Sequence, residues 1–432
     1  DLTIDNIRIT QSIGCEATVT ATVLPGVTRA FAGVTKLIGC GTGLNANKAE
    51  VQVTNVEGGA APYEYQFGTG ASWVASNTGW LDAGTHTVSV RNAGSIGCVY
   101  SMSVNVPAAL ATPVIKTEVF YGCDGKPTLQ VGVQSPVNEL TYLYKLDSGA
   151  FTTTSVFANV SSGTHQVSVK YSYREISSPY ILMKEDFGKG DPTSNSWVDT
   201  NYFTFKDPRT TGIIQAEYTV AAYKDFIAPT AYAALRAPYW PGAPASYWRA
   251  PLKGTTTGGN DDRYLYADMS QATYNKIFLE KEVTIDPNSP IEFNFQLASC
   301  DGNGIYSGRE LSHPNMQIKI VDAANPAIQI AAISSGSIPH DGQWHLISSR
   351  NLGTLNPNGA SRIKIQFINL EQDDFGNDIA IDDITVWQTP ATCGQVVSIT
   401  QNITDNPVGV ASFTAASLGC SATNGTVVVT AS

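Results

Sequence analysis

The clearest strand pattern in this chain is Leu81-Asp82-Ala83-Gly84-Thr85-His86-Thr87-Val88-Ser89-Val90. It recurs as Val160-Ser161-Ser162-Gly163-Thr164-His165-Gln166-Val167-Ser168-Val169. In both copies a Gly-Thr-His turn leads into apolar residues that alternate with polar ones. Such alternation is typical of a strand with one buried face. The chain therefore contains two copies of one β-rich unit.

Aromatic and cysteine positions repeat with the same period. Tyr63 precedes His86 by 23 residues, and Tyr142 precedes His165 by 23 residues. One kind of cysteine opens a strand, and the other ends a Gly-Cys pair. The first kind is Cys15, Cys98 and Cys393, and the second is Cys40, Cys123 and Cys420, with 83 residues from Cys15 to Cys98 and from Cys40 to Cys123. A fixed period indicates tandem domains, and short alternating strands with Gly-rich turns favour immunoglobulin-like β-sandwiches.

The second copy is interrupted by a long insertion. Cys40 and Cys98 are 58 residues apart, whereas Cys123 and Cys393 are 270 apart, so about 212 residues are inserted. Loop closure entropy grows slowly with length, so a folded domain is tolerated there. Period-2 alternation in this segment, with turns between the runs, predicts an antiparallel jelly roll; the runs are 291–297, 316–321 and 363–368.

We therefore expect an all-β chain of tandem immunoglobulin-like β-sandwich repeats with an inserted jelly-roll β-sandwich. A charged fraction of 15% is low for a globular protein and agrees with polar, Thr-rich and Ser-rich sheets. The expected parts are the end of a truncated repeat (1–25), a complete repeat (26–108), a second repeat split by the insertion (109–177 plus 390–405), the inserted domain (178–389) and the start of a further repeat (406–432).

The cysteine spacing predicts the disulfides Cys40–Cys98 and Cys123–Cys393. Cys15 and Cys420 would then pair beyond this chain, and Cys300 would be a free, buried thiol. Alternatively, the Gly-Cys residues are unpaired small core residues. Seven cysteines in a β-rich chain suggest an oxidising, extracellular compartment.

Charge and hydropathy exclude two classes of partner. The formal net charge is −11, and no Lys/Arg cluster is present, so nucleic acid is not expected. No apolar run reaches the roughly 18 to 20 residues needed to span a bilayer. No signal peptide precedes Asp1, so we expect a mature or excised piece of a longer chain.

Acidic motifs at both ends of the insertion predict a structural calcium site. Lys184-Glu185-Asp186-Phe187-Gly188 lies near the start, and Asp378 to Ile384 lies near the finish. A jelly roll brings such ends together, and calcium prefers six to eight oxygen ligands. The predicted ligands are Glu185, Asp186, Asp262 and Asp383. Solvated turn and strand-end residues are the alternative interpretation.

A Pro-rich aromatic stretch predicts ligand contact. Tyr239, Trp240, Tyr247 and Trp248 lie within 14 residues, and such side chains stack on sugar rings or bind proteins. They equally suit a long loop anchored to its own domain.

Catalytic signatures are missing from the sequence. His86 and His165 occupy equivalent repeat positions, which a structural role explains. No nucleophile elbow, zinc-binding helix or phosphate-binding glycine loop is present. Asp382 and Asp383 are neighbours on one strand and point to opposite faces, so they cannot flank one glycosidic bond. We therefore expect no enzyme.

The repeats resemble the SprB-type repeats of Bacteroidetes gliding-motility adhesins. The resemblance lies in Pro62-Tyr63-Glu64-Tyr65, the Leu81–Val90 stretch and Gly97-Cys98. Weaker matches to the same motifs follow Cys123. It implies type IX secretion, anchoring on the cell surface and long arrays that grip surfaces or polysaccharides. The second unit departs from the pattern, because its closing cysteine is displaced and lacks the preceding Gly.

The insertion resembles jelly-roll modules of the MAM and carbohydrate-binding type. The matching residues are Glu185-Asp186-Phe187, the Asp262–Asp268 segment and Ile381-Asp382-Asp383-Ile384. In such modules the end carboxylates hold structural calcium.

These patterns predict a non-catalytic fragment of a large secreted cell-surface adhesin that attaches to surfaces or polysaccharides in gliding motility. Its partners would be glycans and neighbouring repeats of the same chain. Two rival functions are a carbohydrate-binding accessory region of a secreted polysaccharide-degrading enzyme and a ligand-free structural spacer.

Overall fold

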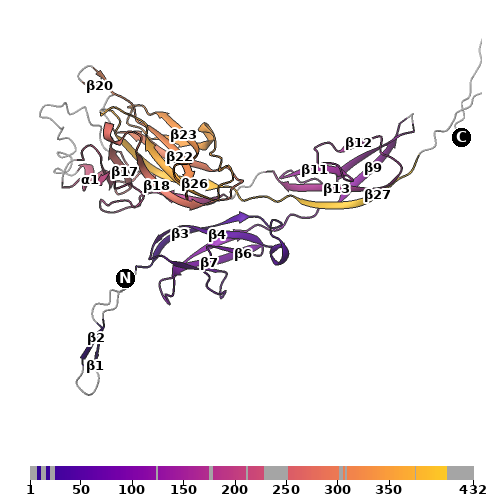
Figure 1. Ribbon diagram of the computed structural model, residues 1–432, viewed down its shortest axis with the longest axis horizontal. Coiled ribbons are helices and arrows are strands. Elements are labelled where there is room, and N and C mark those ends of the chain that lie inside the picture. Colours follow the sequence, from indigo (N-terminus) through magenta and orange to yellow (C-terminus); the bar gives the residue numbers. More distant parts are fainter. Residues whose placement is uncertain are drawn as a thin grey trace, which may run out of the picture. The chain divides into compact units, whose positions relative to one another are not determined.

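The computed structural model confirms an all-β fold (Figure 1). It describes residues 7–10, 16–19, 25–122, 125–174, 179–210, 213–227, 252–300, 305–306, 309–374 and 376–405. The chain forms two compact units. One consists of Asp1–Ala108 with Ser177–Ala391, and the other of Ala109–Ile176 with Thr392–Ser432.

Residues 27–106 form a small β-sandwich, called repeat 1. Its strands alternate buried and exposed residues, which lets two three-stranded sheets pack face to face. One sheet has the order β3-β4-β6 and the other β5-β7-β8. The strands are β3 (Val27–Lys36), β4 (Ala49–Gly58), β5 (Tyr63–Phe67), β6 (Thr78–Leu81), β7 (Gly84–Asn92) and β8 (Tyr100–Val106).

The second sandwich, called repeat 2, has the same topology. Its sheets have the orders β9-β10-β12 and β11-β13-β27. The last strand, β27, comes from after the inserted segment and is equivalent to β8. The strands are β9 (Ile115–Tyr121), β10 (Pro127–Val133), β11 (Leu140–Leu146), β12 (Val156–Ala158), β13 (Gly163–Tyr173) and β27 (Gln395–Ile403).

Equivalent residues make equivalent hydrogen bonds in the two repeats. Ser89 pairs with Ser101 at 2.9 Å, and Ser168 pairs with Ser398 at 2.9 Å. The histidine of each Gly-Thr-His turn bonds through Nε2 to the carbonyl oxygen four residues earlier, at 2.8 Å in repeat 1 and 2.9 Å in repeat 2. These histidines therefore hold a turn, as the repeated sequence predicts.

The inserted domain is a sandwich of two larger sheets. The first has the order β15-β16-β17-β26-β19-β24, with β14 also paired to β26, and the second has the order β18-β25-β22-β23. The first sheet contains β14 (Tyr180–Glu185), β15 (Thr204–Phe205), β16 (Glu217–Ala222), β17 (Arg263–Asp268), β19 (Glu292–Ser299), β24 (His345–Ser348) and β26 (Ile379–Gln388). The second contains β18 (Ile277–Thr284), β22 (Asn315–Asp322), β23 (Gln329–Ser337) and β25 (Arg362–Asn369).

The core of the inserted domain lies between these two sheets. Phe295 of the first sheet and Phe367 of the second are almost fully buried, with ring centroids 5.3 Å apart in an edge-on arrangement. The minor elements are β1 (Ile7–Thr10), β2 (Glu16–Val19), β20 (Ile305–Tyr306), β21 (Arg309–Glu310), α1 (Tyr223–Ile227), α3 (Ser349–Leu352), η1 (Gly43–Asn45) and η2 (Gln271–Thr273).

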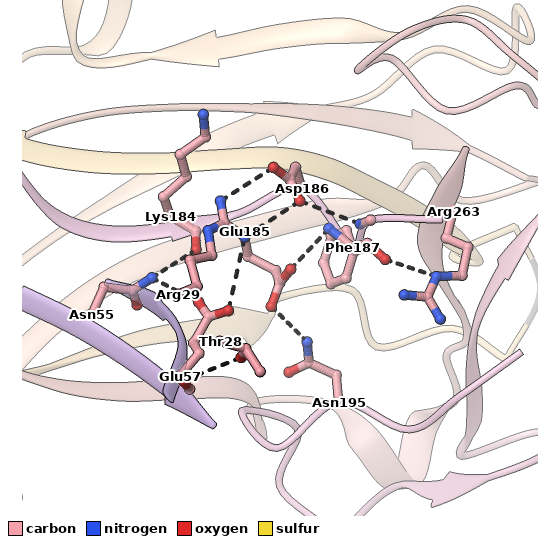
Figure 2. Close-up of polar contacts among 11 residues, drawn as sticks. Thr28, Arg29, Asn55, Glu57, Lys184, Glu185, Asp186, Phe187, Asn195 and Arg263 are labelled. Carbon is pink, nitrogen blue, oxygen red and sulfur yellow. Dashed lines mark hydrogen bonds and ion pairs between the residues drawn. The ribbon is translucent and has the colours of Figure 1, made fainter. Parts of the chain in front are cut away.

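Strand β14 of the inserted domain packs directly against repeat 1. A Cβ on Gly33 would lie 2.4 Å from the Cβ of Tyr180, so only glycine permits this approach of β3 to β14. The Asn55 amide donates to the carbonyl oxygen of Lys184 at 3.2 Å, as Figure 2 shows. The Thr54 hydroxyl donates to the carbonyl oxygen of Ile181. Repeat 1 and the inserted domain therefore share a specific, hydrogen-bonded boundary.

The cysteine pairing differs from the prediction. Cys98 is an exposed free thiol, so the predicted Cys40–Cys98 disulfide is wrong. Cys98 lies against Gly26, just before β3, whereas Cys40 follows the other end of that strand. Ten strand residues span roughly 33 Å, and a disulfide needs Cα atoms within about 7 Å. The period of a repeat shows which residues are equivalent, but not which ones meet.

Cys40 and Cys393 are both disulfide-bonded. Cys123 lies outside the described residues, so the Cys123–Cys393 pair stays a prediction, and Cys15 and Cys420 lie outside them as well.

Candidate functional site

The two acidic motifs of the inserted domain meet inside its first sheet, where the end of β14 pairs with β26. Strand register pairs Glu185 of β14 with Ile384 of β26, next to Asp383. A bridge joins Lys189 to Asp262, and the Arg263 amide donates to the carbonyl oxygen of Gly188 at 3.0 Å. The segments that carry the four predicted calcium ligands are therefore neighbours.

A strand irregularity positions Asp382 and Asp383. Ile379–Ile381 of β26 pair with β17, and Ile384–Gln388 pair with β14, so these two aspartates lie where the partner changes. Asp383 has a φ of 49°, a left-handed value rare for a residue other than glycine. The bulge lets both neighbouring carboxylates reach one loop, which strict strand alternation does not predict.

That loop is the threonine segment, Thr255–Thr257. The Thr255 amide and hydroxyl donate to Asp382 at 2.7 and 3.0 Å. Asp383 accepts from the Thr255 hydroxyl and, at 2.9 Å, from the Thr256 hydroxyl. Burial raises the pKa of Asp382 to about 7, with the nearby Asp383 carboxylate adding to the rise and the Thr255 donors opposing it. Sequence reasoning missed this segment, although the signal was a Gly-flanked Thr run directly before Asn260-Asp261-Asp262.

Asp262 is bound by the same segment. One carboxylate oxygen, Oδ2, accepts from the Thr257 amide at 2.5 Å, the Thr257 hydroxyl at 2.6 Å and the Gly259 amide at 3.2 Å. The other, Oδ1, is buried without a hydrogen-bond partner, and its nearest cation is the Lys189 ammonium at 3.5 Å. A buried carboxylate oxygen with no hydrogen-bond donor is the feature of this site that favours a cation.

Glu185 and Asp186 are held separately (Figure 2). Glu185 accepts from the Phe187 amide at 2.8 Å and the Asn195 amide group at 3.0 Å, and burial raises its pKa. Asp186 accepts from Arg29 of repeat 1 at 3.1 Å. Phe187 has a φ of 50°, an unusual conformation for a bulky residue.

Among the described residues, no three His, Cys, Asp or Glu side chains form a group that fits a metal ion. All four predicted ligands instead accept hydrogen bonds from protein donors. Calcium binding therefore stays a prediction, supported by the unpartnered Asp262 oxygen.

The predicted aromatic ligand contacts Tyr239, Trp240, Tyr247 and Trp248 lie outside the described residues. Within the described part of the inserted domain, two aromatic side chains are more than a third exposed: Tyr202, at 41%, and Tyr274, at 40%. The Lys276 ammonium lies 5.1 Å from the centroid of the Tyr202 ring. We call Tyr202 and Lys276, together with Tyr274 two residues before Lys276, the tyrosine–lysine patch. Sequence reasoning missed it because Tyr202 lies far from Tyr274 and Lys276 along the chain.

No family model matches this chain, and no curated protein matches it. A crystal structure with a xylogluco-oligosaccharide is similar over 91% of this chain and 84% of its own, with 11% identity and a TM-score of 0.17. A SusE-like protein is similar over 64% of this chain and 97% of its own, with 10% identity and a TM-score of 0.19. TM-scores this low carry no argument about function. In the described part of the chain, no helix is long and apolar enough to cross a membrane.

Proposed function

We propose that this chain is a non-catalytic part of a secreted cell-surface adhesin whose inserted domain binds polysaccharide at the tyrosine–lysine patch. The observation that carries the proposal is the exposure of Tyr202 and Tyr274, with Lys276 beside the Tyr202 ring, in a domain whose other described aromatic side chains are more buried.

The chemistry of this patch suits sugars. A tyrosine ring offers an apolar face for a pyranose ring and a hydroxyl for hydrogen bonding. The contact of the Lys276 ammonium is with the Tyr202 ring, and among the described residues it forms no ion pair, so it is available to an anionic group. We therefore expect a preference for polysaccharides that carry carboxylate or sulfate groups.

Two further features support a surface role. The disulfide-bonded cysteines Cys40 and Cys393 indicate an oxidising compartment. Tandem sandwiches that resemble SprB-type repeats suit a long surface array in gliding motility, with neighbouring repeats as further partners. Type IX secretion belongs to the same proposal.

The test is binding of the whole chain to arrayed neutral and acidic polysaccharides, followed by titration of each hit. Tyr202→Ala and Tyr274→Ala should each weaken binding about tenfold, since loss of one stacked ring costs about 1.5 kcal/mol. Lys276→Gln should weaken binding of acidic polysaccharides only.

Phe120→Ser is the matched control, because Phe120 is an exposed aromatic residue of repeat 2. If no polysaccharide binds, the chain is better described as a spacer. If the Tyr202/Tyr274 double variant binds as tightly as the native chain, the glycan contact lies elsewhere.

A further inference from the structure

Repeat 1 presents an exposed segment, Ile96–Cys98, between β7 and β8. The Ile96 side chain is 99% exposed, although isoleucine is normally buried. Ile96 makes no backbone hydrogen bond with any described residue, and Cys98 is an exposed thiol with a φ of 55°. Nothing within repeat 1 accounts for this exposure.

Repeat 2 supplies the counterpart of this segment. Cys98 precedes β8 by two residues, and Cys393 precedes the equivalent strand β27 by two residues. Cys393 is disulfide-bonded. Ala391 stands two residues before Cys393, where Ile96 stands relative to Cys98. The cysteine at this position is thus disulfide-bonded in repeat 2 and an exposed free thiol in repeat 1.

Ala391 shows what such a segment does. It forms a parallel bridge with Lys36 at the end of β3. Its amide donates to the Thr35 carbonyl oxygen at 2.8 Å, and its carbonyl oxygen accepts from the Leu37 amide at 3.2 Å. The Sγ of Cys40, in the Gly-Cys pair that follows β3, lies 3.4 Å from the same carbonyl oxygen, and Cys40 is disulfide-bonded. The end of a β3-type strand is therefore an edge that accepts an added strand beside a bonded cysteine.

We propose that Ile96–Cys98 docks on the β3-type edge of another repeat of the same kind and that Cys98 forms a disulfide with the Gly-Cys cysteine of that repeat. We expect another repeat as the partner because the equivalent segment of this chain, at Ala391, already docks on the end of β3. The junction is head-to-tail, because the docking segment and the receiving edge lie at opposite ends of β3. This inference is independent of polysaccharide binding.

The bond forms by ordinary thiol–disulfide exchange. The Cys98 thiolate attacks a low-molecular-weight disulfide such as oxidised glutathione, which gives a mixed disulfide and one glutathione thiolate. The partner's thiolate then attacks the Cys98 sulfur and releases the second glutathione. Two protein thiols are oxidised, one glutathione disulfide is reduced, and the two thiol protons pass to the two glutathione thiolates.

The test uses the whole chain in a buffer of oxidised and reduced glutathione, where the sequence of a second copy contains the Gly-Cys pair Gly419-Cys420, whose cysteine is expected to bond beyond its own chain. Non-reducing electrophoresis should show linked species that reductant dissolves. Mass spectrometry of the digested species should join the Cys98 peptide to a Gly-Cys peptide. Cys98→Ser should abolish the link, whereas Cys300→Ser, which removes the other described thiol, should not.

A second variant separates docking from simple thiol reactivity. Ile96→Pro removes the amide that corresponds to the Ala391 donor, so linkage should slow about tenfold. Val99→Ala, an exposed change outside the segment, should link at the native rate. Cross-links mainly between two Cys98 residues, no cross-link at all, or an unchanged rate for Ile96→Pro would each overturn the proposal.

Discussion

Arg29 and Asp186 form a two-pronged ion pair between repeat 1 and the inserted domain, with Nη2–Oδ2 at 3.1 Å and Nη1–Oδ1 at 3.4 Å. Arg29 lies on β3, and Asp186 directly follows β14. Glu57 lies 3.8 Å from the same guanidinium. Both side chains of the pair are about three-quarters buried, so solvent screens the pair less than an exposed one. This geometry predicts that the pair helps to hold the two sandwiches together.

Arg29→Ala should lower the free energy of unfolding by about 1 to 2 kcal/mol, because the part-buried Asp186 carboxylate loses its partner. A double-mutant cycle with Asp186→Asn, followed by urea unfolding, should give a coupling energy of about 1 kcal/mol. Arg362→Ala is the matched control, since the Arg362–Glu282 pair is largely exposed and should contribute little. Additive effects of the two changes would rule out a stabilising pair.

The sequence predicted features that follow from local spacing. His86 and His165 were expected to hold equivalent turns, and they do, because one turn sequence produces one set of local bonds. The sequence also predicted that Glu185 lies close to Asp383. The first and last strands of the inserted domain pair with each other, and this pairing brings its two ends together.

Long-range partners did not follow from spacing. Cys40 and Cys98 belong to one repeat, but β3 separates them by its full length. The contact between Arg29 and Asp186 joins residues far apart in sequence, and no periodicity encodes which strand faces which. Thr255–Thr257 binds three carboxylates because a bulge turns Asp383 toward it, and a bulge has no reliable sequence signature.

Repeat 2 should gain a pH-dependent stability from its His165–Asp147 pair. His165 Nδ1 lies 2.8 Å from Asp147, a bond that raises the pKa of His165 and lowers the pKa of Asp147. The His165 contribution is full below about pH 6.5 and is lost as pH rises through the raised value, and the Asp147 contribution is lost as pH falls through the lowered value. The pair therefore stabilises most between roughly pH 4 and 6.5.

His165→Gln should abolish the higher melting temperature that repeat 2 has between roughly pH 4 and 6.5. His86→Gln is the matched control, because His86 makes the same turn bond but has no carboxylate partner among the described residues. Melting followed at pH 3, 5 and 8 checks the prediction, and identical pH profiles for the native chain and His165→Gln would contradict it.

Asp382 should make the inserted domain less stable as the pH rises. Its folded pKa of about 7 lies above the usual value for an aspartate, because burial disfavours the charged form. Stability is therefore highest when the carboxyl is protonated in both states, falls between about pH 4 and 7, and then levels off. Asp382→Asn should abolish that fall and be more stable than the native chain at pH 8 by about 1 to 3 kcal/mol.

Urea unfolding at pH 4, 6 and 8 in a chelating buffer measures this effect. Asp82→Asn is the control, because Asp82 is exposed in repeat 1 and its change should leave the profile unaltered. Parallel profiles for the native chain and Asp382→Asn would show that Asp382 ionises freely.

Calcium is expected to stabilise the inserted domain through Asp262. The buried Asp262 Oδ1 has no hydrogen-bond donor, only the Lys189 ammonium 3.5 Å away, and a bound cation would satisfy that oxygen. A ligand at a hundred times its Kd adds about 2.7 kcal/mol, which raises the Tm of a domain of this size by roughly 5 to 10 °C. Calorimetry of the whole chain in chelator and then in millimolar calcium measures that rise. Asp262→Asn should remove the rise, whereas Asp322→Asn, on the second sheet, should retain it. An equal Tm in chelator and in calcium would mean that Lys189 and the donors of the Thr255–Gly259 loop satisfy Asp262 without an ion.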